Sequence, residues 1–404
     1  MIQRTLKSVI TGQFGKGKVI LLMGARQVGK TTLLKSLFPG FRRFSAEQNP
    51  NVPVEDVLWL NGDELDVQRL FEETSSTRLR FIFGSKRFVV IDEAQRIKDI
   101  GLKLKLIADE IPDIQLVATG SSSFDLANEA NEPLTGRKRE YVMYPLSFAE
   151  MTRRHGLLDE KRLIPHRLVY GYYPEVVNKP GEEREILKSL SDSYLYKDIL
   201  MWERIKKPDK LVKLLQALAF QIGSQVSYSE LGQLCALDAK TTEKYIVLLE
   251  QCYVIFRLAS FSRNLRNELK YSRKIYFFDN GIRNALIADF SLAETRRDIG
   301  ALWENFLVAE RKKKIAYNRE VTNTWFWRTS SQKEIDYIEE SGGTLRAFEF
   351  KWNPSAKYKF PRQFMEQYPD TRFEVIGPDN IDEFLLDMNA GDRGSRPGQV
   401  RFKT

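Results

Sequence analysis

Residues 18–38 read KVILLMGARQVGKTTLLKSLF, and this stretch decides the fold of the amino-terminal part. Residues 18–23 form a short apolar run, which is typical of a buried parallel strand. Residues 24–31 match GxxxxGK followed by Ser or Thr, and residues 32–38 have the spacing of a helix that ends before a Pro-Gly pair. A strand, a glycine loop and a helix in this order predict a phosphate-binding loop, with a chance glycine turn as the alternative.

The chemistry of this loop follows from its residue types. Gly24 and Gly29 let the backbone curl, so that its N–H groups can point at phosphate oxygens. We expect Lys30 to neutralise the β and γ phosphates, and the Thr31 hydroxyl to bind Mg²⁺. The predicted nucleotide-binding residues are Gly24, Ala25, Arg26, Gln27, Val28, Gly29, Lys30, Thr31 and Thr32.

A second stretch supports ATP and Mg²⁺ as the cofactors. Residues 88–91 are apolar and are followed by Asp92 and Glu93, as expected for a buried strand that ends in two carboxylates. Asp92 would hold the magnesium through water, and Glu93 would polarise the attacking water. An ordinary strand followed by a loop is the alternative, but it does not explain the pair of acids. The two stretches together predict ATP hydrolysis.

Two further strands are expected in the same sheet. Residues 115–123 read QLVATGSSS, a buried strand with a polar end that would lie beside the phosphate loop. Ser121 or Thr119 could therefore contact the γ phosphate or the water, while a serine-rich turn is the alternative. Residues 140–144 form another apolar strand. Strands that alternate with helices predict a parallel sheet covered on both faces.

Length and composition bound the number of domains and argue against a membrane-spanning or secreted protein. The chain has 404 residues, too many for one core, so we expect two to four domains. It has no apolar run long enough to span a bilayer and no secretory leader at its amino terminus, which favours a cytoplasmic protein. Cys235 and Cys252 are flanked by apolar residues and are expected to be core thiols. The net charge of +9 fits either spare lysines or a polyanionic partner.

The middle of the chain predicts two helical modules. Residues 182–205 and 209–221 have the pattern of amphipathic helices. Residues 226–256 predict two helices across a short turn, followed by strands, which together resemble a winged helix. Its second helix would present Lys240, Thr242 and Lys244, and the hairpin after it is rich in basic residues. Subunit packing is the alternative to DNA contact. The predicted DNA-binding residues are Lys240, Lys244, Arg263, Arg266, Lys270 and Arg273.

Acidic residues recur in the last part of the chain. Glu304 falls on a predicted helix, Asp336 on a strand, and Glu349 and Lys351 on one face of a further strand. This order resembles the PD-(D/E)xK, or restriction-endonuclease-like, superfamily. The resemblance implies that the three acids bind Mg²⁺ or Mn²⁺ and that the lysine orients the water. A domain that keeps this fold but only binds DNA is the alternative, and Ile335 replaces the proline that often precedes the first strand acid.

The amino-terminal motifs resemble the archaeal-type branch of the AAA+ ATPases, whose members carry a carboxy-terminal domain of unknown function. The stretches that carry the resemblance are VIDEAQ at 90–95, TGSSSF at 119–124 and LTGRKREYVMYPLSFAE at 134–150. The resemblance implies that Arg137 reaches the γ phosphate of a neighbouring subunit, with a surface arginine as the alternative. It implies that Gly171 and Pro174 are the first and last residues of a turn that touches the nucleotide base, with a plain turn as the alternative. It also implies a helical lid and a homo-oligomer, expected to be a hexameric ring.

The expected fold class is α/β: a P-loop AAA+ (RecA-like) parallel sheet, a helical lid and a winged helix, and a carboxy-terminal restriction-endonuclease-like α/β domain. The expected modules are the ATPase core at residues 1–155, the lid at 156–224, the winged helix at 225–290, the nuclease-like domain at 291–388 and a flexible basic tail at 389–404. The predicted function is an ATPase that remodels or moves along duplex or branched DNA. A slow ATP-dependent switch and a non-catalytic DNA-binding regulator are the alternatives.

Overall fold

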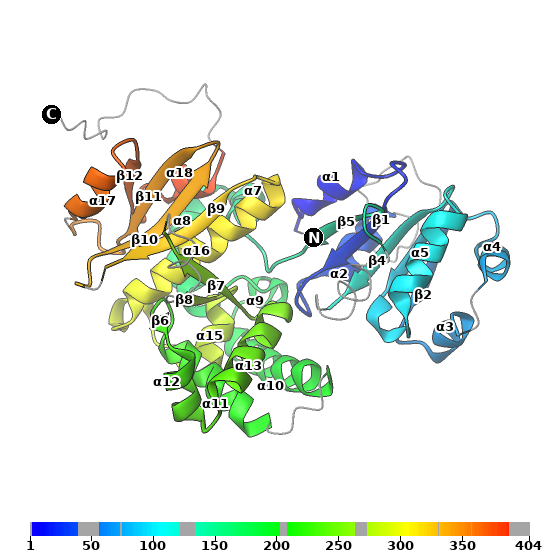
Figure 1. Cartoon of the computed structure of the whole chain (residues 1–404), viewed down its shortest axis with the longest axis horizontal. Coiled ribbons are helices and arrows are strands. Elements are labelled where there is room, and N and C mark those ends of the chain that lie inside the picture. Colours follow the sequence, from blue (N-terminus) through cyan, green and yellow to red (C-terminus); the bar gives the residue numbers. More distant parts are fainter. Residues whose placement is uncertain are drawn as a thin grey trace.

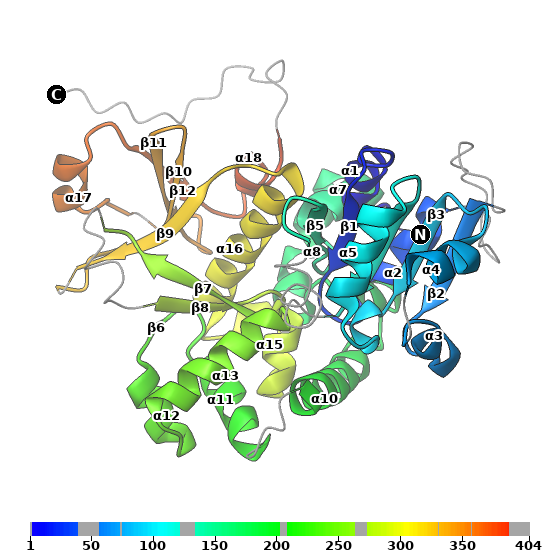
Figure 2. The same cartoon turned by 45° about the vertical axis from the view of Figure 1, so that its right-hand side comes forward.

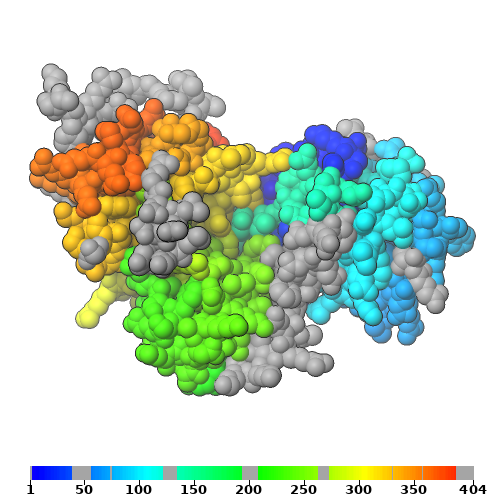
Figure 3. Space-filling view, in the orientation of Figure 1, coloured from blue at the N-terminus to red at the C-terminus, as the bar shows by residue number. Residues whose placement is uncertain are grey.

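The computed structural model describes most of the chain as two lobes that lie side by side (Figures 1 and 3). The amino-terminal strands form the smaller lobe, and the segment from α7 onward forms the larger one. The residues described are 2–38, 56–72, 75–121, 134–202, 208–262, 273–329, 331–356 and 358–387, with side chains left out at 193–202. The predicted basic tail at 389–404 lies outside them.

The amino-terminal lobe contains a five-stranded sheet in the order β2-β3-β4-β1-β5, and every neighbouring pair is parallel. These strands are β1 (Val19–Met23), β2 (Val57–Asn61), β3 (Phe88–Asp92), β4 (Gln115–Gly120) and β5 (Lys138–Val142). The predicted parallel sheet is therefore confirmed, and β4 lies directly beside β1 as expected. Strand β2, at the edge of the sheet, was not predicted.

Both faces of this sheet are buried, because side chains of a strand point alternately to opposite faces. Ile20 and Leu22 enter one hydrophobic core, which α1 and α2 cover, whereas Val19, Leu21 and Met23 enter a second core beneath α3, α4 and α5. These helices are α1 (Leu6–Thr11), α2 (Lys30–Leu37), α3 (Leu65–Leu70), α4 (Ser76–Phe83) and α5 (Ile100–Glu110), and a short 3-10 turn, η3 (Ala94–Arg96), follows β3. The arrangement places the phosphate loop at the carboxyl end of a central strand.

The described part of the larger lobe begins with a group of five helices. They are α7 (Phe148–His155), α8 (Leu157–Tyr170), α9 (Pro174–Asn178), α10 (Glu183–Trp202) and α11 (Pro208–Phe220). Helices α10 and α11 confirm the two predicted helices. Helix α7 was not predicted, although Ser147 and Glu150 form a capping box that marks its start in the sequence.

The next segment contains the two predicted helices across a turn, α12 (Tyr228–Cys235) and α13 (Ala239–Gln251). The Asp238 side chain accepts a hydrogen bond of 2.8 Å from the Thr241 amide and caps α13. One part of the prediction was wrong: Thr242 does not face outward. It is fully buried, and its hydroxyl donates to the Asp238 carbonyl at 2.9 Å, because it lies one helical turn from the cap.

The larger lobe is built on one seven-stranded sheet in the order β12-β11-β10-β9-β7-β8-β6. Its strands are β6 (Gln225–Val226), β7 (Ile255–Ser260), β8 (Arg273–Phe277), β9 (Asn323–Arg328), β10 (Glu334–Ser341), β11 (Thr344–Phe350) and β12 (Arg372–Ile376). Strand β7 pairs in parallel with β9, with Ala259 opposite Trp325. The sheet therefore continues across residue 290, where the sequence predicted a module boundary. Figure 2 shows the long helix α16 (Ile299–Asn318) beside this sheet.

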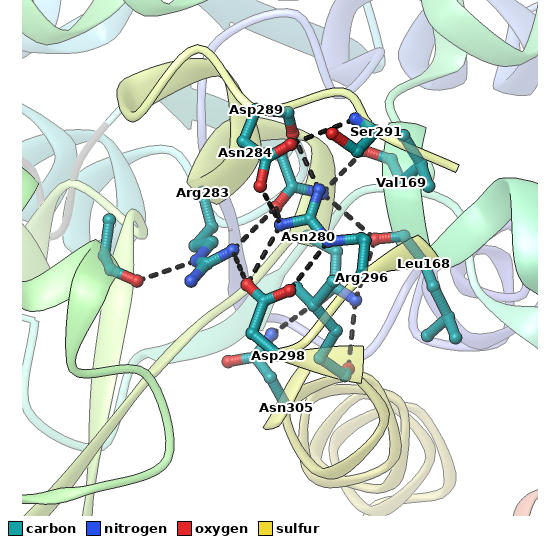
Figure 4. Close-up of polar contacts among 12 residues, drawn as sticks. Leu168, Val169, Asn280, Arg283, Asn284, Asp289, Ser291, Arg296, Asp298 and Asn305 are labelled. Carbon is teal, nitrogen blue, oxygen red and sulfur yellow. Dashed lines mark hydrogen bonds and ion pairs between the residues drawn. The ribbon is translucent and has the colours of Figure 1, made fainter. Parts of the chain in front are cut away.

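A polar network joins three parts of the larger lobe (Figure 4). Arg283 on α15 (Asn280–Leu286) and Arg296 both pair with Asp298, at 2.7 and 2.8 Å. Asn284 donates to the backbone carbonyls of Leu168 and Val169 on α8, at 3.1 and 2.8 Å. Because these groups are largely buried, the network fixes α15 and the start of α16 against α8. Two short helices, α17 (Arg362–Gln367) and α18 (Ile381–Leu385), and a 3-10 turn, η4 (Ala293–Thr295), complete the lobe.

The structure also bears on the predictions about the two cysteines and about membrane-spanning segments. Cys235 and Cys252 are both buried, and each is a free thiol. In the part of the chain that the structure describes, no helix combines the length and the apolar character that crossing a bilayer requires.

Candidate active site

The phosphate loop takes a conformation that its glycines make possible. Gly24 has a φ of 146°, and a Cβ atom there would lie 2.1 Å from the Met143 carbonyl oxygen, so that only glycine fits. Gly29 has a φ of 96° and immediately precedes α2. Lys30 is buried, and its ammonium donates to the carbonyls of Gly24 and Ala25 at 2.8 and 2.9 Å. The loop is thus folded around its own lysine in a shape suited to phosphate oxygens.

Asp92 lies at the centre of a chain of hydrogen bonds beside this loop. The Thr31 hydroxyl donates to Oδ2 of Asp92 at 2.8 Å, and the Thr119 hydroxyl donates to Oδ1 at 2.5 Å. The Glu93 amide in turn donates to Thr119 Oγ1 at 3.0 Å. A hydroxyl and a carboxylate at the end of a phosphate loop are the oxygen ligands that Mg²⁺ takes in nucleotide sites, so these residues fit the predicted ion.

The side chain of Glu93 is held by a residue that sequence reasoning did not single out. Gln95 donates from Nε2 to Oε2 of Glu93 at 2.7 Å and to Oγ of Ser121 at 3.2 Å. Glu93 itself has a left-handed backbone with a φ of 50°, which turns the chain sharply after β3. Gln95 belongs to the VIDEAQ stretch, so its position four residues after Ile91 was visible in the sequence, although its contacts were not.

Lys30, Thr31, Asp92 and Glu93 line one cleft of about 890 Å³, a size that suits a nucleotide, whereas Thr119, Gln95 and Ser121 lie behind this lining. Its lining residues are Ile2, Gln3, Arg4, Lys7, Arg26, Gln27, Val28, Gly29, Lys30, Thr31, Thr32, Leu33, Ser36, Asn61, Asp63, Asp92, Glu93, Arg96, Met143, Leu146, Pro174, Glu175 and Asn178. Helix α9 contributes the last three of them. Helices α10 and α11 contribute no residue to this lining among those described, although α9 also belongs to the module 156–224 that was predicted as the lid.

The two residues expected at the nucleotide base are separated in the structure. Pro174 starts α9 and lines the cleft. Gly171 instead packs against Asp279, where a Cβ atom would lie 2.1 Å from Oδ1. Its φ of 70° lets the Tyr172 amide donate to the Asp279 carboxylate at 2.6 Å. The contacts described for Gly171 are therefore with α15 and its cap.

Arg137 lies at the opposite end of its sheet from the phosphate loop. It immediately precedes β5, and its carbonyl accepts a hydrogen bond of 2.9 Å from the amide of Val19, the first residue of β1. Because β1 and β5 are parallel, Arg137 is remote from the nucleotide of its own chain. Its guanidinium is partly exposed and pairs with Asp109. This position rules out a contact with the nucleotide of the same chain, and a role toward a neighbouring subunit stays a prediction.

The predicted DNA contacts have different surroundings. Lys240 and Lys244 are both exposed on α13. Arg273 is engaged within the chain, since it donates to the Tyr228 hydroxyl at 3.0 Å and pairs with Glu243 at 3.6 Å. The remaining predicted contacts, Arg263, Arg266 and Lys270, lie outside the described residues.

The carboxy-terminal acids converge where α16, β8, β10 and β11 meet. Glu304 pairs with Lys274 at 2.7 Å and accepts a hydrogen bond of 2.6 Å from the Tyr276 hydroxyl. Asp336 accepts one of 2.9 Å from the Phe350 amide. Lys351 pairs with Glu349 at 2.6 Å, as their spacing on one strand face predicted.

The pKa of Asp336 shows that these acids affect one another. Burial raises that pKa well above its ordinary value, and the charges of Glu304 and Glu349 raise it further. Lys274, on β8, is a further member of this group of charged residues. Burial opposes its charge, but Glu304, Asp336 and Glu334 raise its pKa overall.

The predicted metal ligands Glu304, Asp336 and Glu349 lie close enough for their charges to affect one another. Within the described ranges, no three His, Cys, Asp or Glu side chains make a group that could hold a metal ion. The Lys274 ammonium pairs with Glu304 at this point, and metal binding by the three acids stays a prediction.

Three family models match successive parts of the chain. An AAA domain matches residues 16–152, a domain of unknown function (DUF8612) matches residues 161–293, and a second one (DUF4143) matches residues 299–381. The chain therefore carries an AAA-type ATPase domain followed by carboxy-terminal domains of unknown function.

Two relatives match this chain over about two thirds or more of its length. An uncharacterized protein of Mycobacterium tuberculosis is 26% identical over 342 residues, which cover 83% of this chain and 70% of that protein. One of Haemophilus influenzae is 27% identical over 290 residues, which cover 66% and 68%. The Pif1 helicase from Candida albicans shares 16% identity with a TM-score of 0.27 over 47% of this chain and 48% of the helicase. The chain thus spans about half of that helicase, and a TM-score this low carries no argument about function.

Proposed function

We propose that the AAA-type ATPase domain hydrolyses Mg-ATP in order to remodel or move along DNA. One observation supports the ATPase activity above all others: Lys30, Thr31, Asp92 and Glu93 meet in one cleft, although the two pairs are 61 residues apart. Their convergence at the carboxyl ends of β1 and β3 supplies both the phosphate contacts and a base for water.

Each residue would have a separate task in the reaction. Lys30 would exchange its loop carbonyls for the β and γ phosphates, and Thr31 and Asp92 would hold Mg²⁺. When bound, the ion neutralises the phosphate oxygens as charge develops. Glu93, oriented by Gln95, would accept a proton from the attacking water. An arginine of a second subunit, Arg137, would stabilise the transition state, which requires a homo-oligomer such as a ring.

Contact with DNA is supported by the segment that contains α12 and α13. Two helices across a turn followed by the β7–β8 hairpin are the elements of a winged helix. Helix α13 exposes Lys240 and Lys244, and the net charge of the chain is +9. Exposed lysines on the second helix can neutralise backbone phosphates without reading sequence.

Hydrolysis should be measured with and without single-stranded, duplex, forked and four-way DNA. Lys30→Ala should abolish tight ATP binding, whereas Glu93→Gln should bind ATP and fail to hydrolyse it. Strong stimulation by one of the DNA forms is expected. Hydrolysis that no DNA stimulates would favour the alternative, a slow switch that controls a partner.

The DNA-contacting surface can be tested separately by its salt dependence. Lys240→Glu with Lys244→Glu should weaken binding and reduce the slope of log affinity against log salt by about 1 for each phosphate that is no longer neutralised. The same double reversal at Lys98 and Lys188, which are exposed elsewhere in the chain, is the matched control. Equal salt slopes in both variants would show that α13 does not contact DNA.

A further inference from the structure

The starting observation is an arginine close to the amino terminus that contacts the phosphate loop. Arg4 precedes α1, lines the nucleotide cleft and is only 9% exposed. Its Nη1 donates to the carbonyl of Val28, within the loop, at 2.7 Å, and its Nη2 donates to the carbonyl of Tyr144 at 2.7 Å. One guanidinium therefore joins the phosphate loop to the segment that leaves the sheet after β5.

A buried carboxylate fixes the orientation of this guanidinium. Glu150 accepts from Nε of Arg4 at 3.1 Å, and it also accepts from the amides of Thr5 and Ser147 at 2.7 and 3.1 Å. The Glu150 side chain is fully buried, so removing Arg4 would leave a buried carboxylate without its ion-pair partner. A guanidinium has five N–H groups, and these contacts use most of them. Arg4 is therefore better suited to hold the loop than to bind a phosphate itself.

The second observation is a tyrosine from the other lobe that reaches the same point. The Tyr317 hydroxyl accepts a hydrogen bond from the Tyr144 amide at 3.1 Å and one from Nη2 of Arg4 at 3.4 Å. Tyr317 belongs to α16 and is buried. It does not line the nucleotide cleft, so any effect it has on hydrolysis must pass through other residues.

Helix α16 holds the same segment at two further points. Glu310 accepts from the Phe148 amide at 2.7 Å, and Lys313 donates to the Leu146 carbonyl at 2.9 Å. The far part of the helix carries Glu304, which pairs with Lys274 of β8. Glu304 and Tyr317 are separated by about 20 Å along the helix axis, at 1.5 Å per residue. One rigid element thus contacts both the carboxy-terminal acids and the surroundings of the phosphate loop.

We propose that Arg4 is a positioning residue of the phosphate loop and that Tyr317 sets its position, so that α16 couples the larger lobe to ATP hydrolysis. The proposal rests on the proposed ATPase activity. Loop amides bind phosphate only while the loop keeps its curl, and the hydrogen bond from Arg4 fixes the Val28 carbonyl within that loop. When Tyr317 loses its hydroxyl, both the Tyr144 amide and the Arg4 guanidinium lose a hydrogen-bond acceptor.

The test compares two Tyr→Phe substitutions in buried positions. Tyr317→Phe removes the contacted hydroxyl, whereas Tyr141→Phe removes a buried hydroxyl that has no hydrogen-bond partner among the described residues. Tyr317→Phe should lower kcat/KM for ATP by about tenfold, the equivalent of one well-placed hydrogen bond. It should also raise the Kd of a fluorescent ADP analogue several-fold, while Tyr141→Phe changes neither. Melting temperatures show whether both variants are folded.

Arg4→Lys keeps a positive charge beside Glu150 but removes most of the directed hydrogen bonds that the guanidinium makes. It should reduce kcat/KM at least as much as Tyr317→Phe. Combining Arg4→Lys with Tyr317→Phe should cause little further loss, because the tyrosine acts through the arginine. The proposal would be overturned if the loss of kcat/KM in the double variant equalled the product of the two single losses. It would also be overturned if Tyr317→Phe had native kcat/KM and native ADP affinity. If the native chain hydrolyses no ATP, the proposed function fails, and the ADP affinities still decide this inference.

Discussion

Thr119→Val is the sharpest test of how this site is assembled. Thr119 lies on β4 and is fully buried, and its hydroxyl joins the two acids at the end of β3. It donates to Asp92 at 2.5 Å and accepts from the Glu93 amide at 3.0 Å. Valine has almost the same shape but offers neither interaction, so the substitution removes both bonds without opening a cavity.

The expected loss of stability follows from the two bonds. A hydrogen bond to a charged group contributes about 1.5–3 kcal/mol, and one between neutral groups about 0.5–1.5 kcal/mol. Both partners stay buried or half-buried after the change, so we expect Thr119→Val to lower the free energy of unfolding by about 2–4 kcal/mol. Thr119→Ser keeps the hydroxyl and removes one methyl group, which costs about 0.8 kcal/mol.

The catalytic effect should appear in the dependence on Mg²⁺. Outer partners of metal ligands typically change metal affinity or activity by about 10- to 100-fold when removed. Thr119→Val should therefore need more Mg²⁺ for half-maximal ATP hydrolysis, whereas Thr119→Ser should resemble the native chain. Urea unfolding and a Mg²⁺ titration of the hydrolysis rate measure the two effects. If the valine and serine variants unfold at the same urea concentration and share one Mg²⁺ dependence, Thr119 does not organise Asp92.

Three other predictions follow from interactions elsewhere in the chain. Gly171→Ala should destabilise the chain by more than about 2 kcal/mol, since its Cβ atom would lie 2.1 Å from Asp279, and an unchanged melting temperature would contradict this. Burial raises the pKa of Asp298, but the hydrogen bond from Arg296 and the charge of Arg283 lower this pKa overall. The ion pairs of Asp298 therefore stabilise the fold above the unfolded pKa of 3.8, and this stabilisation is lost as the pH falls through the lower pKa of the folded state. Asp298→Asn should therefore cost about 2 kcal/mol at pH 7 and progressively less below pH 3.8 in urea unfolding; an equal cost at both pH values would argue against the ion pairs. Arg137→Ala should bind ATP normally and hydrolyse it slowly, and mixing it with Lys30→Ala should restore activity unless the site is not shared between subunits.

The sequence by itself determined the nucleotide-binding part of this protein. The loop from Gly24 to Thr31 is contiguous, and its glycines, lysine and threonine are required by the backbone conformation and charge of a phosphate site. The same holds for the parallel sheet, because apolar runs of strand length alternate with helical segments. Pairs such as Lys351 and Glu349 were also predictable, since residues two apart on a strand share a face.

Only the tertiary structure decided how the lobes are joined. Arg4 and Tyr317 are 313 residues apart, and nothing in either local sequence specifies their contact. The pairing of β7 with β9, and the approach of Lys274 to Glu304, were hidden for the same reason. Helix and strand patterns report which face of an element is buried, but not which partner covers it. That choice depends on packing between segments distant in the chain, and here it placed Lys274 of β8 beside Glu304 of α16.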